Sequence, residues 1–229
     1  GKITYPDDSV YEGNFVDGIV YEGNFVDGDW AGKGKVTWAN GNIYEGDWLN
    51  GWMTGNGKGK ITYPDDSVYE GNFVDGDWAG KGKHTWASGS IYEGDWLNGE
   101  QAGKGKLTWA NGDVYEGDWL NGEKTGTGKQ TWANGDVYEG DWLNGEMTGN
   151  GKQTDTDGIV YEGNFVDGYW TGKGKVTWAN GNVYEGDWLN SLWTGKGKRT
   201  WANGDIYEGE WVNGEMTGNG KQTDTDGIV

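Results

Sequence analysis

The 229-residue sequence has no cysteine, 2 prolines and 1 histidine, and its 18 cationic residues are far outnumbered by 37 acidic ones. Without cysteine there is no disulfide framework and no thiolate metal site, and cysteine–histidine catalysis is excluded. No run of about 18 apolar residues occurs, so no membrane-spanning segment is predicted. The formal net charge of −19 opposes binding to nucleic acid and makes membrane binding unfavourable, because both surfaces are negative.

Ordinary core residues are also scarce. Hydrophobic residues make up 33% of the chain and aromatic residues alone 15%, so nearly half of the apolar side chains are aromatic. The 47 glycines could suggest a low-complexity tail, but disordered segments are poor in aromatic residues. We therefore expect a folded, soluble, cytoplasmic protein, although the lack of cysteine does not itself identify the compartment.

One stretch is repeated along the chain. Thr-Trp-Ala-Asn-Gly-Asp-Val-Tyr-Glu-Gly-Asp-Trp-Leu-Asn-Gly at 131–145 recurs with variations, and from Tyr69 onward Tyr-Glu-Gly returns every 23 residues. A fixed period of this length is typical of a repeat array whose unit is one supersecondary element. We predict a single array over residues 1–229, with an irregular or broken unit at 1–20 and regular units from about 69 to 229.

Each unit has the pattern of a β-hairpin. Residues 126–132 and 136–142 can form strands, and the loop Ala-Asn-Gly between them suits a type I turn followed by a left-handed glycine. This turn pairs Gln130 with Tyr138 and Lys129 with Glu139. Alternation then places Trp and Tyr on one face of the sheet and Lys–Glu pairs on the other.

The connection to the next hairpin sets how the faces continue. A four-residue loop at 120–123 would pair Trp119 with Lys124 and place Tyr115 opposite Gly128, so that an aromatic ring covers bare glycine backbone. The sequence thus predicts an all-β fold: an elongated, twisted single-layer antiparallel meander of β-hairpins, one hairpin per 23 residues.

Two spacings depart from the period. The step from Tyr11 to Tyr21 is 10 residues, so the junction at Asp17-Gly18 indicates either a true deletion or a gap closed up in the numbering. The step from Tyr44 to Tyr69 is 25 residues, because a Gly-Lys pair is added within 57–60. An even insertion is expected to keep the two faces in phase.

The motif Tyr-Glu-Gly-x-Trp-x-x-Gly-x-x-x-Gly-x-Gly at this period resembles the MORN repeat over essentially the whole chain. Strings such as Asp-Thr-Asp-Gly at 155–158 are similar to the MORN repeats that precede a SET-domain lysine methyltransferase, but no SET segment is present. The resemblance implies a hairpin array that serves as a scaffold. It also implies lipid binding, yet positions that carry Arg or His in many MORN units hold Glu, Gln, Met, Thr or Trp here.

The sequence predicts neither an enzyme nor a cofactor or metal site. His84 is expected to be packed on the aromatic face, and carboxylates recur in every unit instead of forming one catalytic pair. Asp155 to Gly158 faintly resembles a calcium loop, but it lacks the distal ligands and is better interpreted as a turn.

The aromatic face is the one candidate site. A large apolar surface marks an interaction site, and a single-layer sheet is expected to bury only about half of the aromatic surface. The predicted partner-binding residues are the repeated tryptophans and tyrosines: Trp38, Tyr44, Trp48, Trp86, Tyr92, Trp96, Trp109, Tyr115, Trp119, Trp132, Tyr138, Trp142, Trp178, Tyr184, Trp188, Trp201, Tyr207 and Trp211.

Several functions fit this face. The first hypothesis is a non-catalytic scaffold whose aromatic groove binds a protein partner, such as an amphipathic helix, or a second copy of the chain. The alternatives are a repeat module that binds glycans or lipid headgroups, and an artificial array with no native task.

Overall fold

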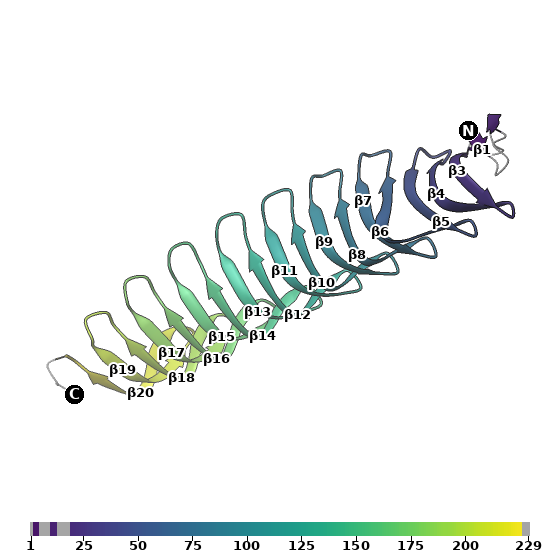
Figure 1. Cartoon of the computed structure of the whole chain (residues 1–229). Helices are drawn as coiled ribbons and strands as arrows, with labels where there is room; N and C mark the ends of the chain where they lie inside the picture. The colour runs from purple at the N-terminus through teal and green to yellow at the C-terminus, as the bar shows by residue number, and fades with distance from the viewer. Residues whose placement is uncertain (1, 5–9, 13–18, 226–229) are drawn as a thin grey trace. The chain divides into compact units, whose positions relative to one another are not determined.

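The computed structural model describes residues 2–4, 10–12 and 19–225, which form β-strands joined by short turns, with no helix among them. The described residues accordingly contain no helix that could cross a membrane. The chain forms two compact units: unit 1 comprises Gly1–Asn111 and Trp119–Gly122, and unit 2 comprises Gly112–Asp118 and Glu123–Val229. Within each unit the hairpins lie side by side in sequence order, one per repeat (Figure 1).

The strands are regular in length. Unit 1 contains β1 (Lys2–Thr4), β2 (Val10–Glu12), β3 (Val20–Val26), β4 (Asp29–Thr37), β5 (Ile43–Leu49), β6 (Trp52–Thr62), β7 (Val68–Val74), β8 (Asp77–Thr85), β9 (Ile91–Leu97) and β10 (Glu100–Thr108). The residues of β11 (Val114–Leu120) are divided between the units. Unit 2 contains β12 (Glu123–Thr131), β13 (Val137–Leu143), β14 (Glu146–Thr154), β15 (Val160–Val166), β16 (Tyr169–Thr177), β17 (Val183–Leu189), β18 (Leu192–Thr200), β19 (Ile206–Val212) and β20 (Glu215–Thr223).

The hairpin around Ala-Asn-Gly has the predicted register. Between β12 and β13, Gln130 is opposite Tyr138 and Lys129 is opposite Glu139, without a slip along the ladder. The turn is closed by the Gly135 N–H donating to the Trp132 carbonyl at 2.8 Å, and Gly135 adopts a φ of 97°. This is the predicted type I turn followed by a left-handed glycine.

The second connection differs from the prediction. Instead of a four-residue loop, a two-residue Asn-Gly turn joins β13 to β14, and both turn residues have positive φ, 49° at Asn144 and 83° at Gly145. This is the geometry of a type I′ turn, whose twist matches that of the flanking strands. Two residues are then left out of the ladder, so that Gly140 is opposite Gly151 and Tyr138 is opposite Gln153. The predicted pairing of Tyr with Gly across this connection is therefore wrong.

A carboxylate holds the bulge that causes this shift. Gly149 begins the bulge with a φ of 55°, a conformation that glycine adopts without strain. The next N–H, that of Asn150, loses its ladder partner and donates to Asp141 Oδ2 at 2.8 Å. The same contact recurs from Lys104 to Asp95 and from Lys196 to Asp187. The aspartate of Gly-Asp-Trp thus satisfies a donor that the bulge would leave unpaired.

The N-terminal strands depart from the predicted meander. Strand β1 pairs antiparallel with β2 but parallel with β3, so it lies between them. The Asp17-Gly18 junction lies outside the described residues. The two-residue insertion is accommodated within β6, where pairing is interrupted between Gly55 and Gly59. On either side of it, Met53 is opposite Trp48 and Ile61 is opposite Tyr44, which confirms that the faces stay in phase.

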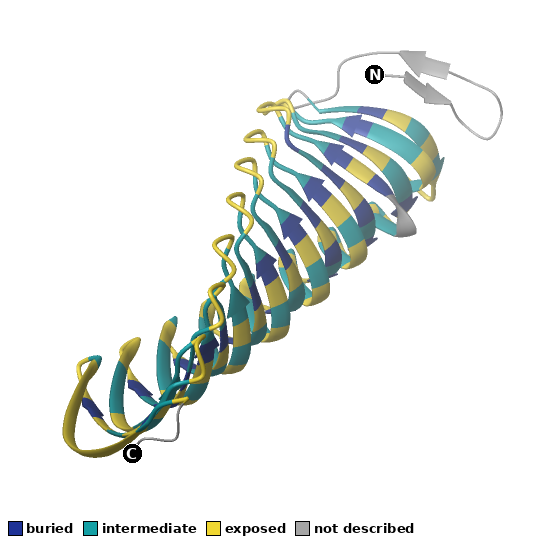
Figure 2. Cartoon of the chain, turned by 90° about the vertical axis from the view of Figure 1, so that its left-hand side faces the viewer, coloured by how far each residue is buried: buried dark blue, intermediate teal, exposed yellow. Residues whose placement is uncertain are grey.

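The core of each unit is the aromatic face. Figure 2 shows buried segments at corresponding places in successive strands. Their side chains are chiefly the tyrosine of each Tyr-Glu-Gly and the tryptophan or phenylalanine four residues later. We call this pair the framework.

Candidate functional site

The framework tyrosine lies over a pair of glycines. Tyr138 is fully buried, and its hydroxyl donates to the Asp141 carbonyl at 3.0 Å. A Cβ placed on Gly140 or Gly151 would lie 2.5 Å from the Tyr138 Oη. Burial raises the pKa of Tyr138, and the nearby Asp141 charge adds to this effect. The predicted covering of glycine by an aromatic ring therefore occurs, although the tyrosine reaches the glycine pair diagonally rather than from directly across the ladder.

The framework tryptophan bonds across its own hairpin and also contacts the preceding hairpin. Trp142 packs edge-on against Tyr138 at 5.3 Å and against Tyr115 at 5.1 Å. Its Nε1 donates to the Gly128 carbonyl at 3.1 Å. Trp188 makes the same contact with Gly174. Because the donor is buried, this bond fixes the two strands of the hairpin against each other, while the ring contact with Tyr115 joins the hairpin to the preceding one.

The structure separates the predicted site residues into two groups. The framework members are at most 9% exposed, because the chain itself covers them more completely than the single-layer estimate predicted. These members are Tyr44, Trp48, Tyr92, Trp96, Tyr115, Trp119, Tyr138, Trp142, Tyr184, Trp188, Tyr207 and Trp211. The tryptophan before each Ala-Asn-Gly, or Ala-Ser-Gly, turn is only half-buried: Trp38, Trp86, Trp109, Trp132, Trp178 and Trp201. That these residues bind a partner stays a prediction.

A further row on this face was left out of the predicted site, although the predicted loop already paired Lys124 with Trp119. Its residues lie in strands, directly opposite the framework tryptophan or phenylalanine. We call them the variable row: Trp30, Met53, Trp78, Gln101, Lys124, Met147, Trp170, Trp193 and Met216. The pairing of Lys124 with Trp119, applied to every repeat, would have found this row.

The tryptophans of the variable row stack on the framework tyrosines. Trp170 lies parallel to Tyr161, with ring centroids 4.3 Å apart, and Trp193 lies parallel to Tyr184 at the same distance. All four tryptophans of the row are half-buried. Each indole therefore has one side packed on the framework while part of its surface stays accessible to a ligand.

Polar groups are set among these rings. Arg199 lies over the rings of Trp201, at 4.7 Å, and Trp193, at 5.4 Å. The Trp170 Nε1 donates to Gln153 Oε1 at 3.0 Å. Lys124 Nζ donates to Gln130 Oε1 at 2.7 Å. The cation–π contacts of Arg199 contribute about 0.5–2 kcal/mol, depending on desolvation.

His84 is packed on the aromatic face, as predicted. It lies opposite Tyr92 in the position that Val36 and Gln130 hold in other repeats. It is 7% exposed, and its ring centroid is 4.3 Å from that of Trp86. Burial lowers the pKa of His84, while the Asp65 charge opposes this shift.

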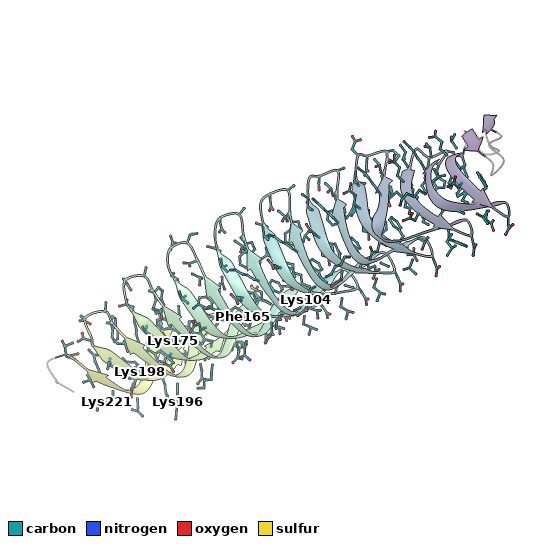
Figure 3. The ribbon with its side chains drawn as sticks, in the orientation of Figure 1. Lys104, Phe165, Lys175, Lys196, Lys198 and Lys221 are labelled. Atoms are coloured by element: carbon teal, nitrogen blue, oxygen red, sulfur yellow. The ribbon has the colours of Figure 1, made fainter. Side chains whose placement is uncertain are left out.

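The opposite face carries lysines and carboxylates (Figure 3). The predicted pairs form: Lys35 and Glu45 are 3.0 Å apart, and Lys33 and Asp47 are 2.7 Å apart. These side chains are 33–73% exposed, so each pair stabilises the sheet only slightly. Among the described residues, no group of three or more His, Cys, Asp or Glu side chains could hold a metal ion.

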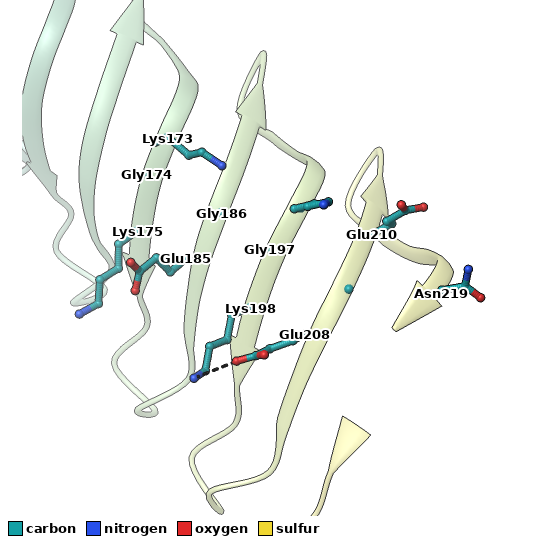
Figure 4. A pocket seen from close by; sticks show the side chains of 12 residues that line it. Lys173, Gly174, Lys175, Glu185, Gly186, Gly197, Lys198, Glu208, Glu210 and Asn219 are labelled. Carbon is teal, nitrogen blue, oxygen red and sulfur yellow. Dashed lines mark ion pairs between the residues drawn. The ribbon is translucent and has the colours of Figure 1, made fainter. Parts of the chain in front are cut away.

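A cavity of about 930 Å³ opens on this opposite face over β16–β20 (Figure 4). Its lysines are matched by carboxylates, as in the ion pair of Lys198 with Glu208 at 3.1 Å. Lys173 likewise pairs with Asp187 at 2.6 Å. The charges are balanced, so the cavity shows no preference for a strongly charged ligand.

Comparison with known proteins bears on the fold. A family model described as the MORN repeat matches nine consecutive segments, from residues 21–43 to residues 207–229. No curated protein matches the sequence. Among solved structures, the chain is similar to the SAS-4 (dCPAP) TCP domain of Drosophila melanogaster, solved with a proline-rich motif of Ana2 (dSTIL). Sequence identity is 16%, 67% of this chain and 83% of that chain are covered, and the TM-score is 0.42.

The chain is also similar to the TCP10 domain of Danio rerio CPAP, solved with a peptide of STIL. Sequence identity is 14%, 90% of this chain and 99% of that chain are covered, and the TM-score is 0.41.

The family match agrees with the geometry of the repeat. Every matched segment begins on a framework tyrosine, and together the segments cover residues 21–229 without a gap. The matched unit therefore contains the Tyr-over-glycine contact and the framework tryptophan or phenylalanine. The chain belongs to the MORN repeat family.

Proposed function

We propose that this chain is a non-catalytic repeat scaffold that binds a protein segment along its aromatic face. One observation carries the proposal. On that face the framework holds Tyr with Trp or Phe in every described hairpin, while the variable row, half-buried except for the exposed Met216, holds Trp, Met, Gln or Lys. The framework builds the sheet, and the variable row differs between hairpins while its side chains stay accessible to a partner.

The composition of the accessible surface supports a protein ligand. Trp170 and Trp193 are held flat on framework tyrosines, so little side-chain freedom is lost when a partner covers them. Arg199 and Gln153 add hydrogen-bonding groups beside them. Tryptophan and arginine in a rigid setting are typical of the residues that dominate protein–protein binding energy.

The position of the one histidine supports a non-catalytic role. His84 is enclosed by tryptophan rings and has a lowered pKa, so at neutral pH it is an uncharged packing residue. The carboxylates recur in equivalent positions along the repeats, which favours structural roles such as that of the aspartate that holds the bulge in Gly-Asp-Trp repeats.

The test uses residues that the array already accepts. Trp170→Met, Trp193→Met and Arg199→Gln each install a side chain found at the equivalent position of another hairpin, at Met147, Met216 and Gln153. Peptides that bind the unmodified chain would be selected from a displayed library of about 16-residue random sequences, and their Kd measured by biolayer interferometry. The control replaces Glu162 and Lys175 with Gln on the opposite face.

We expect the triple variant to weaken the selected peptides by at least about tenfold and the control to leave them unchanged. Urea denaturation of each variant verifies that the fold is kept. Peptides that respond only to the control would refute the aromatic face as the binding surface. Light scattering that shows a dimer dissociated by the triple variant would identify a second copy as the ligand. A tryptophan fluorescence change with a glycan panel, but no selected peptide, would favour a glycan module.

A further inference from the structure

A second apolar feature lies outside the aromatic face. Just before the two-residue turn of each hairpin stands a leucine or valine that is more than half exposed, from 52% at Val166 to 60% at Leu49. We call these residues the turn-end row: Val26, Leu49, Val74, Leu97 and Leu120 in unit 1, and Leu143, Val166, Leu189 and Val212 in unit 2. Single exposed leucines are ordinary, but an exposed apolar residue at the same place in every hairpin marks an interaction surface.

Strand alternation places the row on the lysine–carboxylate face. Leu97 is two residues beyond Asp95 and four beyond Glu93, so all three side chains leave the same side of β9. The framework therefore lies on the other side and cannot cover the row. A strand position this exposed would accept Thr or Lys equally well, so folding alone does not explain why every hairpin carries Leu or Val here.

The charge around the first four members of the row in unit 1, from Val26 to Leu97, has one sign. Their turn ends carry five exposed carboxylates: Asp27, Asp29, Asp75, Asp77 and Glu100. No lysine or arginine occurs in the four segments that form these ends, residues 26–31, 49–54, 74–79 and 97–102, whereas the end at Leu120 is followed by Lys124. The lysines of this face lie farther along the strands, where Lys33 and Lys81 pair with Asp47 and Asp95. From Val26 to Leu97 the turn ends therefore form an apolar row bordered only by negative charge.

The spacing of the row suits a helix. Its members stand on every second strand, about 9.5 Å apart for hydrogen-bonded neighbours. Seven residues of an α-helix rise about 10.5 Å, so apolar side chains repeated every seven residues keep pace over three or four hairpins. We propose that the turn-end row of unit 1 docks a cationic amphipathic helix, whose apolar stripe contacts Leu49, Val74 and Leu97 while its lysines or arginines face the bordering carboxylates.

The charge of the surface favours a cationic helix over a second copy of the chain or a lipid bilayer as the ligand. A second copy of the chain also carries a net charge of −19 and presents the same carboxylates, so two turn-end rows would repel each other. Anionic bilayers are disfavoured for the same reason. A cationic amphipathic helix is stabilised both by apolar contact with the leucine and valine side chains and by attraction to the bordering carboxylates.

The probe is a fluorescently labelled helical peptide of about 21 residues, with leucine at the apolar heptad positions and lysine beside them. Its controls are the same peptide with glutamate for lysine and a scramble of the same composition, which bears the charge without the stripe. Kd is measured by fluorescence anisotropy on the full chain. The row is altered by Leu49→Thr, Val74→Thr and Leu97→Thr together, which leave the framework intact.

Two charge variants are matched. Asp75→Asn, Asp77→Asn and Glu100→Gln remove carboxylates at the turn ends, and Glu22→Gln, Glu70→Gln and Glu93→Gln remove as many from the rest of the same face. We expect the threonine variant to weaken the lysine peptide by at least about tenfold, the turn-end charge variant by several-fold, and the distant charge variant by much less.

Other results would overturn the proposal. Equal effects of the two charge variants, with none from the threonine variant, would mean that the peptide binds only through diffuse charge. A dimer that the threonine variant dissociates in light scattering would assign the row to a second copy, and row-dependent flotation with phosphatidylcholine vesicles would assign it to lipid. A scramble that binds as tightly as the helix would also refute it. None of these readouts involves the aromatic face, so the two proposals can fail separately.

Discussion

Successive strands are joined alternately by an Ala-Asn-Gly turn and an Asn-Gly turn, and strand register is fixed differently at the two kinds of turn. At the Ala-Asn-Gly end, pairing runs without a slip from Thr131 opposite Val137 to Gly126 opposite Trp142. At the Asn-Gly end, pairing begins with Leu143 opposite Glu146 and breaks after Asp141. It resumes with Gly140 opposite Gly151, so that two residues of β14 are left out. One end is a continuous ladder and the other contains a bulge.

The two turns differ in how far apart in the sequence the residues that fix the strand register lie. The continuous end depends on one contiguous turn, in which Gly135 takes the left-handed conformation. The bulged end depends on a left-handed Gly149 and on Asp141, whose carboxylate binds an N–H nine residues away. The glycine pair of Gly140 and Gly151 lies where the two kinds of pairing meet, and Tyr138 covers it.

The largest effect is expected at this meeting point. In Gly140→Ala the new Cβ would lie 2.6 Å from Gly151 Cα and from the Asn150 carbonyl, and 2.5 Å from the Tyr138 hydroxyl, so the backbone of both strands must shift. Overpacking of a rigid contact costs about 1–3 kcal/mol or more, and we expect the upper part of that range. Urea denaturation followed by tryptophan fluorescence measures it.

The matched control is Gly145→Ala in the Asn-Gly turn, where a Cβ meets nothing within 4 Å and only the φ of 83° is unfavourable. It should cost about 1 kcal/mol. Equal losses from the two variants would mean that covering by Tyr138 is not what requires a glycine at 140.

The next effect isolates the bulge. Asp141→Ala removes the acceptor of the Asn150 N–H and leaves that donor to solvent, for an expected loss of about 1–2 kcal/mol. Glu139→Ala, two residues earlier on the same face, removes an exposed carboxylate opposite Lys129 and should cost only a few tenths of a kcal/mol. Chemical denaturation of both variants compares them, and a larger loss from Glu139→Ala would contradict the role given to Asp141.

This comparison explains what the sequence could predict. The Ala-Asn-Gly register, the two faces and the lysine–carboxylate pairs follow from adjacent residues and strict alternation. The bulge does not, because Gly149 and Asn150 continue the alternation and give no local sign of leaving the ladder. The pairing of Trp119 with Lys124 follows from the sequence and places the equivalent Trp170 opposite Phe165, but it does not show that Trp170 stacks on Tyr161. The burial of the framework was underestimated because it depends on contacts between hairpins, such as that of Trp188 with Tyr161.

A smaller effect compares one turn with its equivalents. Ser191 holds a φ of 63° at the turn position that is glycine in the other described hairpins. Ser191→Gly should stabilise the chain by about 0.5 kcal/mol, because the strain of a left-handed serine exceeds the entropy cost of glycine by a small margin. The margin is small because the Ser191 Oγ accepts a hydrogen bond from the Trp170 N–H at 3.2 Å. Gly168→Ser at the equivalent turn should be destabilising, and thermal unfolding of both variants checks the opposite signs.

The smallest effect is the pH dependence of stability that arises from Lys124, which lies just after an Asn-Gly turn. Lys124 lies over the rings of Tyr115 and Trp142, and burial lowers its pKa from 10.5 to about 8, against the pull of Asp113 and Glu146. The unfolded chain then binds more protons between pH 8 and 10.5, so this residue's contribution to stability rises through that window and is lost as the pH falls through about 8.

Lys124→Met installs the residue that Met147 provides in the next hairpin, and it removes this dependence. Because the amine is only partly desolvated, we expect the stability of the original chain relative to the variant to rise by only about 0.3 kcal/mol from pH 8 to pH 10. Urea denaturation at the two pH values measures the difference. A difference that falls with pH would mean that the ring contacts favour the charged amine more than desolvation opposes it.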